Sequence, residues 1–524
     1  MCPNHFYTVL VTKGSAMLVC GMLLGVPFGG AIAACSKSAN QEPNDPNGSL
    51  VTGARGGAAG SAGTTATAVG AGGHAGEDDA FTAAGNGGQD GAAGSAPHAS
   101  DARCGSDLPR IQSFEPERAA RGKMLFERGS LTPGVVPEAI MRSLWVAWGA
   151  APPASDEAFW QQAAERYGLT QAPGQNGGLP LGLGRDGGGL VSFNCLLCHT
   201  STMAGTTLIG AANHRVDLES LFDDLLLLRD LAPSLGLPLL PVPFELDGFT
   251  YAAGAQDAFG LGFRLMGAGP GFGPQRAPAW WQLHYKERAF ADGSGDARSH
   301  RSTMATLVAF GVTPDQLVAR EQDFIDVFHY LLSLEPPCWS FTTLDAQQVE
   351  LGQALFETQC ATCHGVHSGA DASYPNRIVP LDMVRTDPVR AERFTVVEAT
   401  SLNTSWFGMP PFEATGGYLA PPLVGIWARA PYFHNGSVPD LTGVLDPTQR
   451  PAMWRRVERD GSDFDPERVG LKHEVVSSSA DSNTRDGRLV YDTTREGMGN
   501  GGHDFAAALS AEQRADLLEY LRSL

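Results

Sequence analysis

The sequence is poor in basic residues. Its 524 residues include 37 lysines and arginines but 57 aspartates and glutamates, which gives a formal net charge of −20. Nucleic acids and anionic membrane surfaces attract proteins of the opposite charge balance. We therefore expect no nucleic-acid partner and an acidic, solvated surface. Hydrophobic residues make up 43% of the chain, enough for packed cores in two or three domains.

The sequence also lacks an unbroken apolar run near its N-terminus. Pro27 and several glycines interrupt residues 16–34, whereas a membrane-spanning helix needs about 20 consecutive apolar residues. Lys13 before this stretch and the small residues before Cys35 are typical of an export signal. The Ile-Ala-Ala-Cys sequence ending at Cys35 resembles a bacterial lipobox, which implies cleavage before Cys35 and lipidation of its thiol. An ordinary signal peptide or a retained helix is the alternative.

We thus predict that residues 1–35 are a signal peptide with a lipobox. The protein is then exported as a periplasmic or cell-surface lipoprotein of a Gram-negative bacterium, held by a lipid anchor at the outer membrane. Residues 36–103 are rich in Gly, Ala, Ser and Thr and poor in large apolar side chains. Such a segment cannot bury enough apolar surface to offset the entropy of ordering. We predict a disordered tether there, between the anchor and a folded body.

Cysteine is sparse, with nine residues in all, yet four of them form two copies of the pattern C-x-x-C-H. This pattern is the attachment signature of c-type haem, in which the thiols bond to the vinyl groups and the histidine becomes the proximal iron ligand. Redox pairs and zinc sites also use C-x-x-C, but neither explains an adjacent histidine twice. We predict two covalently bound haem c groups, held by Cys195, Cys198 and His199 and by Cys360, Cys363 and His364.

Two further cysteines, Cys104 and Cys338, flank the first unit described below. An oxidising compartment permits a disulfide between them. Two unrelated thiols are the alternative.

An internal repeat organises the rest of the chain. Gly122–Glu127 and Gly352–Glu357 open two units, and Asp326–Leu334 and Asp516–Leu524 close them. Asp, Tyr, Leu, Ser and Leu recur at identical offsets in the two closing segments. Both closing segments have the apolar spacing of amphipathic helices.

The predicted fold follows from these helices. Ser510 with Gln513 forms a capping-box pattern at the start of the last helix. Opening and closing helices beside a haem motif resemble class I cytochrome c. We therefore expect a mostly α fold of two class I cytochrome c-like haem domains with long loop insertions. Their predicted bounds are residues 104–337 and 338–524, with Pro336 and Pro337 at the division.

The sixth coordination position of each iron decides what a haem can do. Candidates at the second haem are Met409, His434, Met498 and His503. His503 lies in a glycine-rich loop before the last helix, which can bring a ligand close to a porphyrin. The candidates at the first haem belong to no distinctive motif. They are His214, His284, His300, Met266 and Met304.

The aromatic residues Trp280, Trp281 and Phe290 could line an apolar distal pocket, conduct electrons between haems, or simply pack in the core.

Several stretches resemble the di-haem cytochrome c peroxidase superfamily, beginning with Pro431–Ser437. More specifically, the chain resembles the rubber oxygenase branch, extracellular di-haem enzymes that cleave polyisoprene with dioxygen. The stretches that carry this likeness are Asn194–His199, Gly210–Asp217, Pro278–Trp281, Tyr374–Pro380, Thr386–Pro388, Asp465–Gly470 and Asn500–His503.

The resemblance implies roles for individual residues. The haem on His199 would be the active one, with an open distal side shaped by Trp280, Trp281 and Phe290. The haem on His364 would have His503 as its second axial ligand and would transfer electrons. Some relatives in the superfamily also carry a calcium ion between the domains, so calcium is a candidate second cofactor.

Several functions are compatible with these features. The first is an oxidoreductase that activates dioxygen toward an organic substrate that the sequence does not identify. A peroxidase using hydrogen peroxide would need an acid/base group over the iron, and Glu219, His214 and Glu287 are undistinguished candidates. An electron-transfer cytochrome or a gas sensor would need no substrate. The expected redox partner is another cytochrome or a cupredoxin.

Overall fold

The computed structural model describes residues 106–128, 131–171, 178–235, 248–258, 260, 271–305, 314–457 and 463–524. The predicted signal peptide with Cys35, the predicted tether, Cys104 and Met266 lie outside these residues. All described residues belong to one compact unit, and the domain division at residues 337 and 338 stays a prediction. None of the helices within the described ranges is long and apolar enough to cross a membrane.

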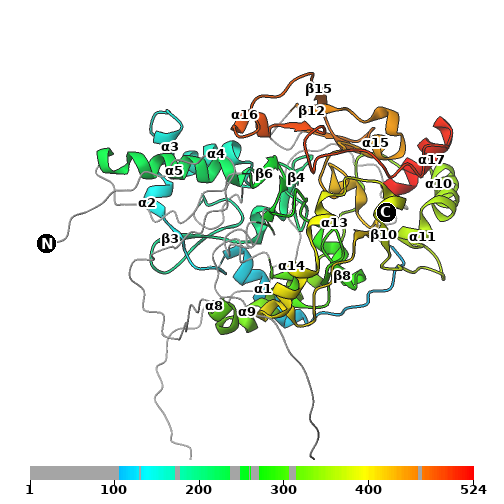
Figure 1. The fold of residues 1–524 in the computed structure, drawn as a ribbon, viewed down its shortest axis with the longest axis horizontal. Helices are drawn as coiled ribbons and strands as arrows, with labels where there is room; N and C mark the ends of the chain where they lie inside the picture. Colours follow the sequence, from blue (N-terminus) through cyan, green and yellow to red (C-terminus); the bar gives the residue numbers. More distant parts are fainter. Residues whose placement is uncertain are drawn as a thin grey trace, which may run out of the picture. The chain divides into compact units, whose positions relative to one another are not determined.

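Two helix pairs correspond to the sequence repeat. Helix α1 (Pro116–Arg128) packs on α9 (Glu321–Leu332), and α10 (Ala346–Gln359) packs on α17 (Ala511–Ser523). Figure 1 shows α10 and α17 side by side, with α1 and α9 likewise together at another place in the fold. The expected capping box of α17 is confirmed, since Ser510 and Gln513 cap each other's backbone N–H groups.

A glycine lies at the crossing point of each pair. A Cβ atom on Gly122 would collide with the carbonyl oxygen of Asp326, and one on Gly352 would collide with that of Asp516. The two backbones can approach this closely only without a side chain at that position. The glycines and aspartates that recur in the sequence therefore form the same backbone contact in each helix pair.

The expectation of a mostly α fold made of two class I cytochrome c-like haem domains is wrong. The structure is 40% helical and 14% strand, and the strands form many small sheets. The prediction rested on the helices that open and close each repeat. It treated the long connecting segments as loop insertions, and these segments fold into short antiparallel hairpins and ribbons.

The strands pair as follows. One three-stranded sheet has the order β1 (Val136–Pro137), β3 (Leu190–Phe193), β2 (Leu183–Arg185), and another has the order β15 (His473–Val475), β12 (Met453–Arg456), β16 (Val490–Asp492). The two-stranded sheets are β4 (Thr200–Met203) with β5 (Thr206–Ile209), β6 (Thr250–Ala252) with β7 (Ala255–Gln256), β8 (Arg288–Ala289) with β9 (Gly295–Asp296), β10 (Ile378–Pro380) with β11 (Gly417–Leu419), and β13 (Phe464–Asp465) with β14 (Gly470–Leu471).

Short helices connect these elements. The α-helices are α2 (Glu138–Met141), α3 (Leu144–Ala147), α4 (Asp156–Tyr167), α5 (Leu218–Leu235), α7 (His300–Thr303), α8 (Pro314–Ala319), α11 (Ala361–His364), α12 (Leu381–Val384), α13 (Val389–Arg393), α14 (Val396–Asn403), α15 (Leu441–Leu445) and α16 (Arg485–Arg488). The 3₁₀ helices are η2 (Cys195–Leu197), η3 (Trp280–Tyr285), η5 (Trp406–Gly408), η6 (Ile426–Arg429) and η7 (Pro447–Gln449).

Buried polar contacts join the first half of the chain to the second. Arg488 in α16 pairs with Asp217 at 3.1 Å and with Glu219 at 3.1 Å, at the start of α5. The buried His214 lies between Ser201 and Asp463, with its Nδ1 2.9 Å from the hydroxyl and its Nε2 3.2 Å from the carboxylate. These contacts hold the two halves of the chain together. Because the side chains are almost fully buried, a substrate cannot reach them.

Candidate functional site

One turn of chain presents the second pair of thiols. Cys360 ends α10 and begins α11, and its carbonyl accepts hydrogen bonds from the N–H groups of Cys363 at 3.1 Å and His364 at 3.0 Å. Gly365 follows at φ +86°, where a Cβ atom would collide with the carbonyl of Ser373. This compact turn brings two cysteines and the histidine to one side, as attachment to a single porphyrin requires.

The ring of His364 is oriented by a proline carbonyl. Its Nδ1 donates a hydrogen bond to the carbonyl oxygen of Pro421 at 2.8 Å. That bond leaves Nε2 as the lone-pair nitrogen, and a partner on the other ring nitrogen is how metal-binding histidines are normally held. Burial lowers the pKa of His364, so the ring is neutral and able to bind a metal.

His503 lies opposite His364. The centroids of the two imidazole rings are 6.1 Å apart. A nitrogen–metal bond of about 2.0 Å on each side, plus the two ring radii, places opposed imidazoles about 6 Å apart. Burial lowers the pKa of His503 to about 3, so its ring is neutral as well. These two histidines therefore fit an iron between them.

The loop that carries His503 is fixed by side chains from elsewhere. Arg450 donates hydrogen bonds to the carbonyls of Asn500 at 3.0 Å and Gly502 at 2.7 Å. The Nδ2 of Asn435 donates to the carbonyls of residues 497 and 499 at 3.0 and 2.9 Å. Thus the Pro431–Ser437 motif acts by shaping this loop, and His503 itself adopts φ +52°.

The first pair of thiols lies on a similar turn. The carbonyl of Cys195 accepts from the N–H groups of Cys198 at 3.1 Å and His199 at 3.0 Å. Asn194 caps this 3₁₀ turn, because its side-chain oxygen accepts from the N–H of Leu196 at 2.9 Å. The four motif cysteines are all free of disulfides, so their thiols are open to haem attachment.

A proline carbonyl holds this histidine too. The Nδ1 of His199 donates to the carbonyl oxygen of Pro278 at 3.1 Å, and burial lowers the pKa of His199 to about 3. The indole of Trp280 stacks on the imidazole with centroids 4.2 Å apart and planes 13° apart. Trp280 therefore lies on the same side of a bound haem as His199. Trp281 points elsewhere, and its Nε1 donates to the carbonyl of Val424 at 3.0 Å.

Phe290 belongs to a group of aromatic side chains near the first site. Its ring lies 6.0 Å from that of Phe412, which lies 6.5 Å from that of Phe394, which lies 5.6 Å from that of Phe272. They share one hydrophobic cluster with Leu196, beside Cys195. Phe290 adopts φ +67°, a strained conformation that is often associated with functional sites. Sequence reasoning missed the other three rings, which are scattered along the chain and form no motif.

The roles predicted for Trp280, Trp281 and Phe290 in a reaction stay predictions.

The described histidines and methionine predicted as candidate ligands of the first haem make other contacts. His300 pairs with Glu321 at 2.9 Å, His284 approaches the carbonyl of Leu332 at 3.3 Å, and Met304 is buried in the core. Within the described ranges no second histidine ring contacts that of His199.

The remaining candidates at the second haem are less well placed than His503. Met409 is 69% exposed, Met498 is fully buried in the core, and His434 stacks on Tyr418 with centroids 4.1 Å apart. None of these contacts brings them to His364.

No group of three or more His, Cys, Asp or Glu side chains in the described part of the chain could hold a metal ion, such as calcium.

Cys338 is disulfide-bonded. Its expected partner, Cys104, lies outside the described residues, so this pairing stays a prediction. The hydroxyl of Ser106 and the N–H of Asp107 donate to the carbonyl of His367 at 2.8 and 2.9 Å. The chain that follows Cys104 therefore lies against the segment that follows the second haem motif.

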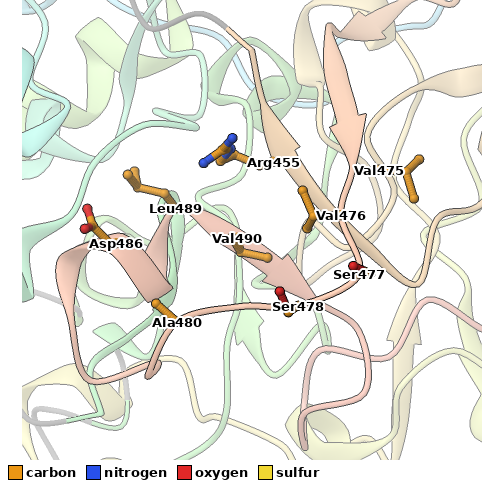
Figure 2. Close-up of a pocket in the computed structure, with 9 residues that line it drawn as sticks. All are labelled: Arg455, Val475, Val476, Ser477, Ser478, Ala480, Asp486, Leu489 and Val490. Carbon is orange, nitrogen blue, oxygen red and sulfur yellow. The ribbon is translucent and has the colours of Figure 1, made fainter.

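A surface pocket lies away from both motifs. It has a volume of about 560 Å³ and is lined by Arg455 of β12, Val490 of β16 and the segment after β15. Figure 2 shows these side chains, with Asp486 and Val475 at opposite sides of the group. None of its lining residues belongs to either haem motif.

Comparison with known proteins adds a family relation. Residues 417–455 match the family described as "RoxA-like, cytochrome c-like". The matched segment includes Pro421, which orients His364, and Arg450, which holds the His503 loop. The match supports a c-type cytochrome related to the rubber oxygenases, with haem c as cofactor and haem-dependent redox chemistry in general.

Two curated relatives come from Sinorhizobium fredii. The chain is 26% identical over 286 residues to "Uncharacterized protein y4iM", which covers 47% of this chain and 63% of that protein. It is 24% identical over 259 residues to "Uncharacterized protein y4iJ", which covers 36% of this chain and 41% of that protein. In both cases the chain spans less than two thirds of the relative's own length.

Proposed function

We propose that the protein is an exported di-haem c-type cytochrome oxidoreductase. Cys195, Cys198 and His199 would hold a haem that supplies dioxygen-activating chemistry toward an organic substrate, and Cys360, Cys363 and His364 would hold a haem that supplies electron transfer. The observation that carries this proposal is the difference between the two histidines. His364 faces His503 at a ring separation of 6.1 Å, whereas His199 contacts Trp280 on its own side and no second histidine in the described ranges.

A bound haem supplies redox and ligand-binding chemistry at its iron. The chain's own residues set the conditions for it. Pro278 and Pro421 fix the tautomers of His199 and His364, so that each presents Nε2 to the metal. Trp280 restricts rotation of the His199 ring by stacking on it. Such control of ligand orientation is one of the protein's main means of tuning a haem.

Phenylalanine rings pack in the hydrophobic cluster beside the first site. Phe272, Phe290, Phe394 and Phe412 form an apolar group there, and an apolar surround suits a hydrocarbon substrate. This group favours oxygenase chemistry over a polar reaction.

A peroxidase fits the described residues less well. It needs a free acid/base group over the iron. His214 is engaged with Ser201 and Asp463, and Glu219 accepts from the N–H of Thr250 at 2.7 Å and pairs with Arg488. Glu287 is an exposed residue. These three candidates therefore have structural or surface positions.

Partners and location extend the proposal. Export as a lipoprotein rests on the Cys35 sequence, and it agrees with the disulfide at Cys338, which an oxidising compartment favours. Electrons would reach the His364 haem from another cytochrome or a cupredoxin. Dioxygen would be the oxidant, and hydrogen peroxide is the alternative.

Oxygen uptake tests the proposal. Purified full-length protein is supplied with emulsified polyisoprene or smaller unsaturated hydrocarbons, and the double variant Cys195→Ala/Cys198→Ala is the matched control. We expect dioxygen consumption with the parent protein and none with the variant. Rapid oxidation of a reduced cytochrome by hydrogen peroxide, without hydrocarbon-dependent oxygen uptake, would instead identify a peroxidase.

A further inference from the structure

A fully buried histidine, His367, lies in the segment that follows the second haem motif. Its Nε2 accepts a hydrogen bond from the backbone N–H of Leu423 at 2.9 Å. A backbone N–H can only donate, so the Nε2 of His367 carries no proton and the neutral ring has its proton on Nδ1. Burial agrees with this state, because it lowers the pKa of His367 to about 3. The ring therefore serves as a side-chain acceptor for a backbone group inside the protein.

The segment bonded to His367 also carries the carbonyl that orients His364. Pro421 accepts from the Nδ1 of His364 at 2.8 Å, and Leu423 lies two residues further along the chain. His367 in turn lies three residues after His364. The two hydrogen bonds therefore join the same two short segments, one through each histidine ring.

The first haem site has the same arrangement with a backbone acceptor. Pro278 accepts from the Nδ1 of His199, and the N–H of Trp280, two residues after this proline, donates to the carbonyl of Gly210 at 2.9 Å. The N–H of Gly210 donates to the carbonyl of His199 at 2.8 Å. In both sites the residue two positions after the proline is thus bonded to the chain that follows the haem motif. The second site differs because its acceptor is a side chain, which a substitution can remove.

Several contacts fix His367 in its place. Its carbonyl accepts from the hydroxyl of Ser106 at 2.8 Å and from the N–H of Asp107 at 2.9 Å. The carboxylate of Asp107 accepts from the N–H of Gly369 at 2.6 Å. The ring of His367 meets that of Phe356 edge to face, with centroids 5.4 Å apart. Both the backbone and the ring are held, so the Nε2 acceptor has a defined position.

We propose that His367 is a positioning residue for the second haem. By holding Leu423, it keeps the Pro421 carbonyl against the Nδ1 of His364 and so sets the reduction potential of a haem bound at this motif. This inference rests on the proposed function, because it requires a haem there. Partners of this kind, one step removed from the metal, orient the ligand and tune the metal.

The direction of the effect follows from the hydrogen bond at His364. An imidazole that donates from Nδ1 to an acceptor is a more basic metal ligand. A more basic ligand stabilises the ferric state over the ferrous state, so this bond lowers the reduction potential. Without the His367 acceptor, the Pro421 carbonyl is free to move away, and the potential of this haem rises. The first haem keeps its potential, because its acceptor is the backbone carbonyl of Gly210.

Substitution tests the assignment in the intact two-haem protein. His367→Leu removes the acceptor, whereas His367→Gln keeps a side-chain oxygen near the position of Nε2. His473→Leu is the matched control, because His473 lies in the same half of the chain and its ring lies 5.9 Å from that of Trp454. We expect His367→Leu to raise the potential of the low-spin haem and to shift its EPR g values, and His367→Gln to restore both toward the parent. The control, and the other haem in every variant, should keep the parent values.

Several outcomes would overturn the inference. If the parent carries haem at both motifs but His367→Leu keeps the potential and the g values, this inference fails alone. Equal shifts in His367→Leu and His473→Leu, or no recovery in His367→Gln, would show that the histidine only supports the fold. If peptide mass spectrometry of the parent finds no haem at the second motif, the proposed function fails with it.

A further measurement needs no variant, so the inference stays testable if His367→Leu does not fold. Nitrogen-15 NMR of the reduced parent protein saturated with carbon monoxide reports which ring nitrogen of each histidine carries the proton. We expect His367 to carry its proton on Nδ1 and the amide of Leu423 to exchange slowly with solvent. A proton on the Nε2 of His367, or rapid exchange of the Leu423 amide, would contradict the assignment.

Discussion

The two haem motifs share one side and differ on the other. In both, a single turn closed on the first cysteine carbonyl presents the thiols, and a proline carbonyl accepts from the histidine Nδ1. The surroundings of the two motifs differ. His364 faces His503, whereas the His199 site adjoins a group of phenylalanine rings.

This difference teaches how a repeated unit can acquire two tasks. The C-x-x-C-H turns recur in both units, and each histidine also has a proline carbonyl as its partner. The distal side is formed by long connecting segments, which are free to diverge between the units. In the proposed function, a coordinating histidine at one site would favour electron transfer, and an apolar surround at the other would favour chemistry on a substrate.

The largest effect that we expect comes from removing one attachment site at a time. Cys195→Ala/Cys198→Ala and Cys360→Ala/Cys363→Ala should each halve the covalent haem content, because each pair of thiols bonds to one haem. The pyridine haemochrome assay and intact mass measure this content. Loss of both haems from either variant would show that the sites are not independent.

The next effect concerns the distal histidine. His503→Ala should convert the His364 haem from a low-spin form to one that binds carbon monoxide, because the sixth ligand is gone. Optical and EPR spectra measure the change. His434→Gln is the control, since His434 lies in the same half of the chain but stacks on Tyr418. An unchanged low-spin signal in His503→Ala would exclude His503 as the ligand.

The helix crossings should respond equally in the two units. Gly122→Ala and Gly352→Ala each place a Cβ atom against an aspartate carbonyl, and overpacking of this kind costs about 1–3 kcal/mol. Chemical denaturation measures the loss of stability. Gly187→Ala is the control, because no atom lies within 4 Å of its added Cβ. A large loss at only one crossing would contradict their equivalence.

The smallest effect is a pH dependence at His434. Burial lowers its pKa in the folded protein from 6.5 to about 3, so the unfolded chain binds the proton more tightly. The stabilising contribution of the neutral ring is complete above pH 6.5 and falls as the pH drops toward 3. Between pH 6.5 and 5 the loss is about 2 kcal/mol. Chemical denaturation at both pH values measures the free energy of unfolding. This free energy should change less with pH in His434→Gln than in the parent, and an equal change in the two proteins would contradict the prediction.

The sequence predicted the parts of the site that are local. The C-x-x-C-H motifs gave the predicted attachment residues, which stay predictions. His503, predicted as the ligand opposite His364, has its ring 6.1 Å from that of His364, and the capping box at Ser510 is confirmed. The carbonyls of Pro278 and Pro421 were missed, because a backbone acceptor leaves no mark on residue type.

The fold was predicted where periodicity is strong and missed where it is weak. The paired helices α1 with α9 and α10 with α17 follow an apolar repeat that a sequence displays directly. The small sheets consist of strands of two to four residues. Strands this short carry too few alternating positions to be recognised, so the mostly α expectation failed in the connecting segments.

Carbon monoxide binding to the fully reduced protein tests the central claim most directly. The contrast between the two sites predicts one carbon monoxide bound for every two haems, with the His364 haem remaining low-spin. His503→Ala should raise this number to two carbon monoxide molecules for every two haems. A parent protein that binds none would be an electron carrier with both irons fully ligated, and one that binds two would contradict the role of His503.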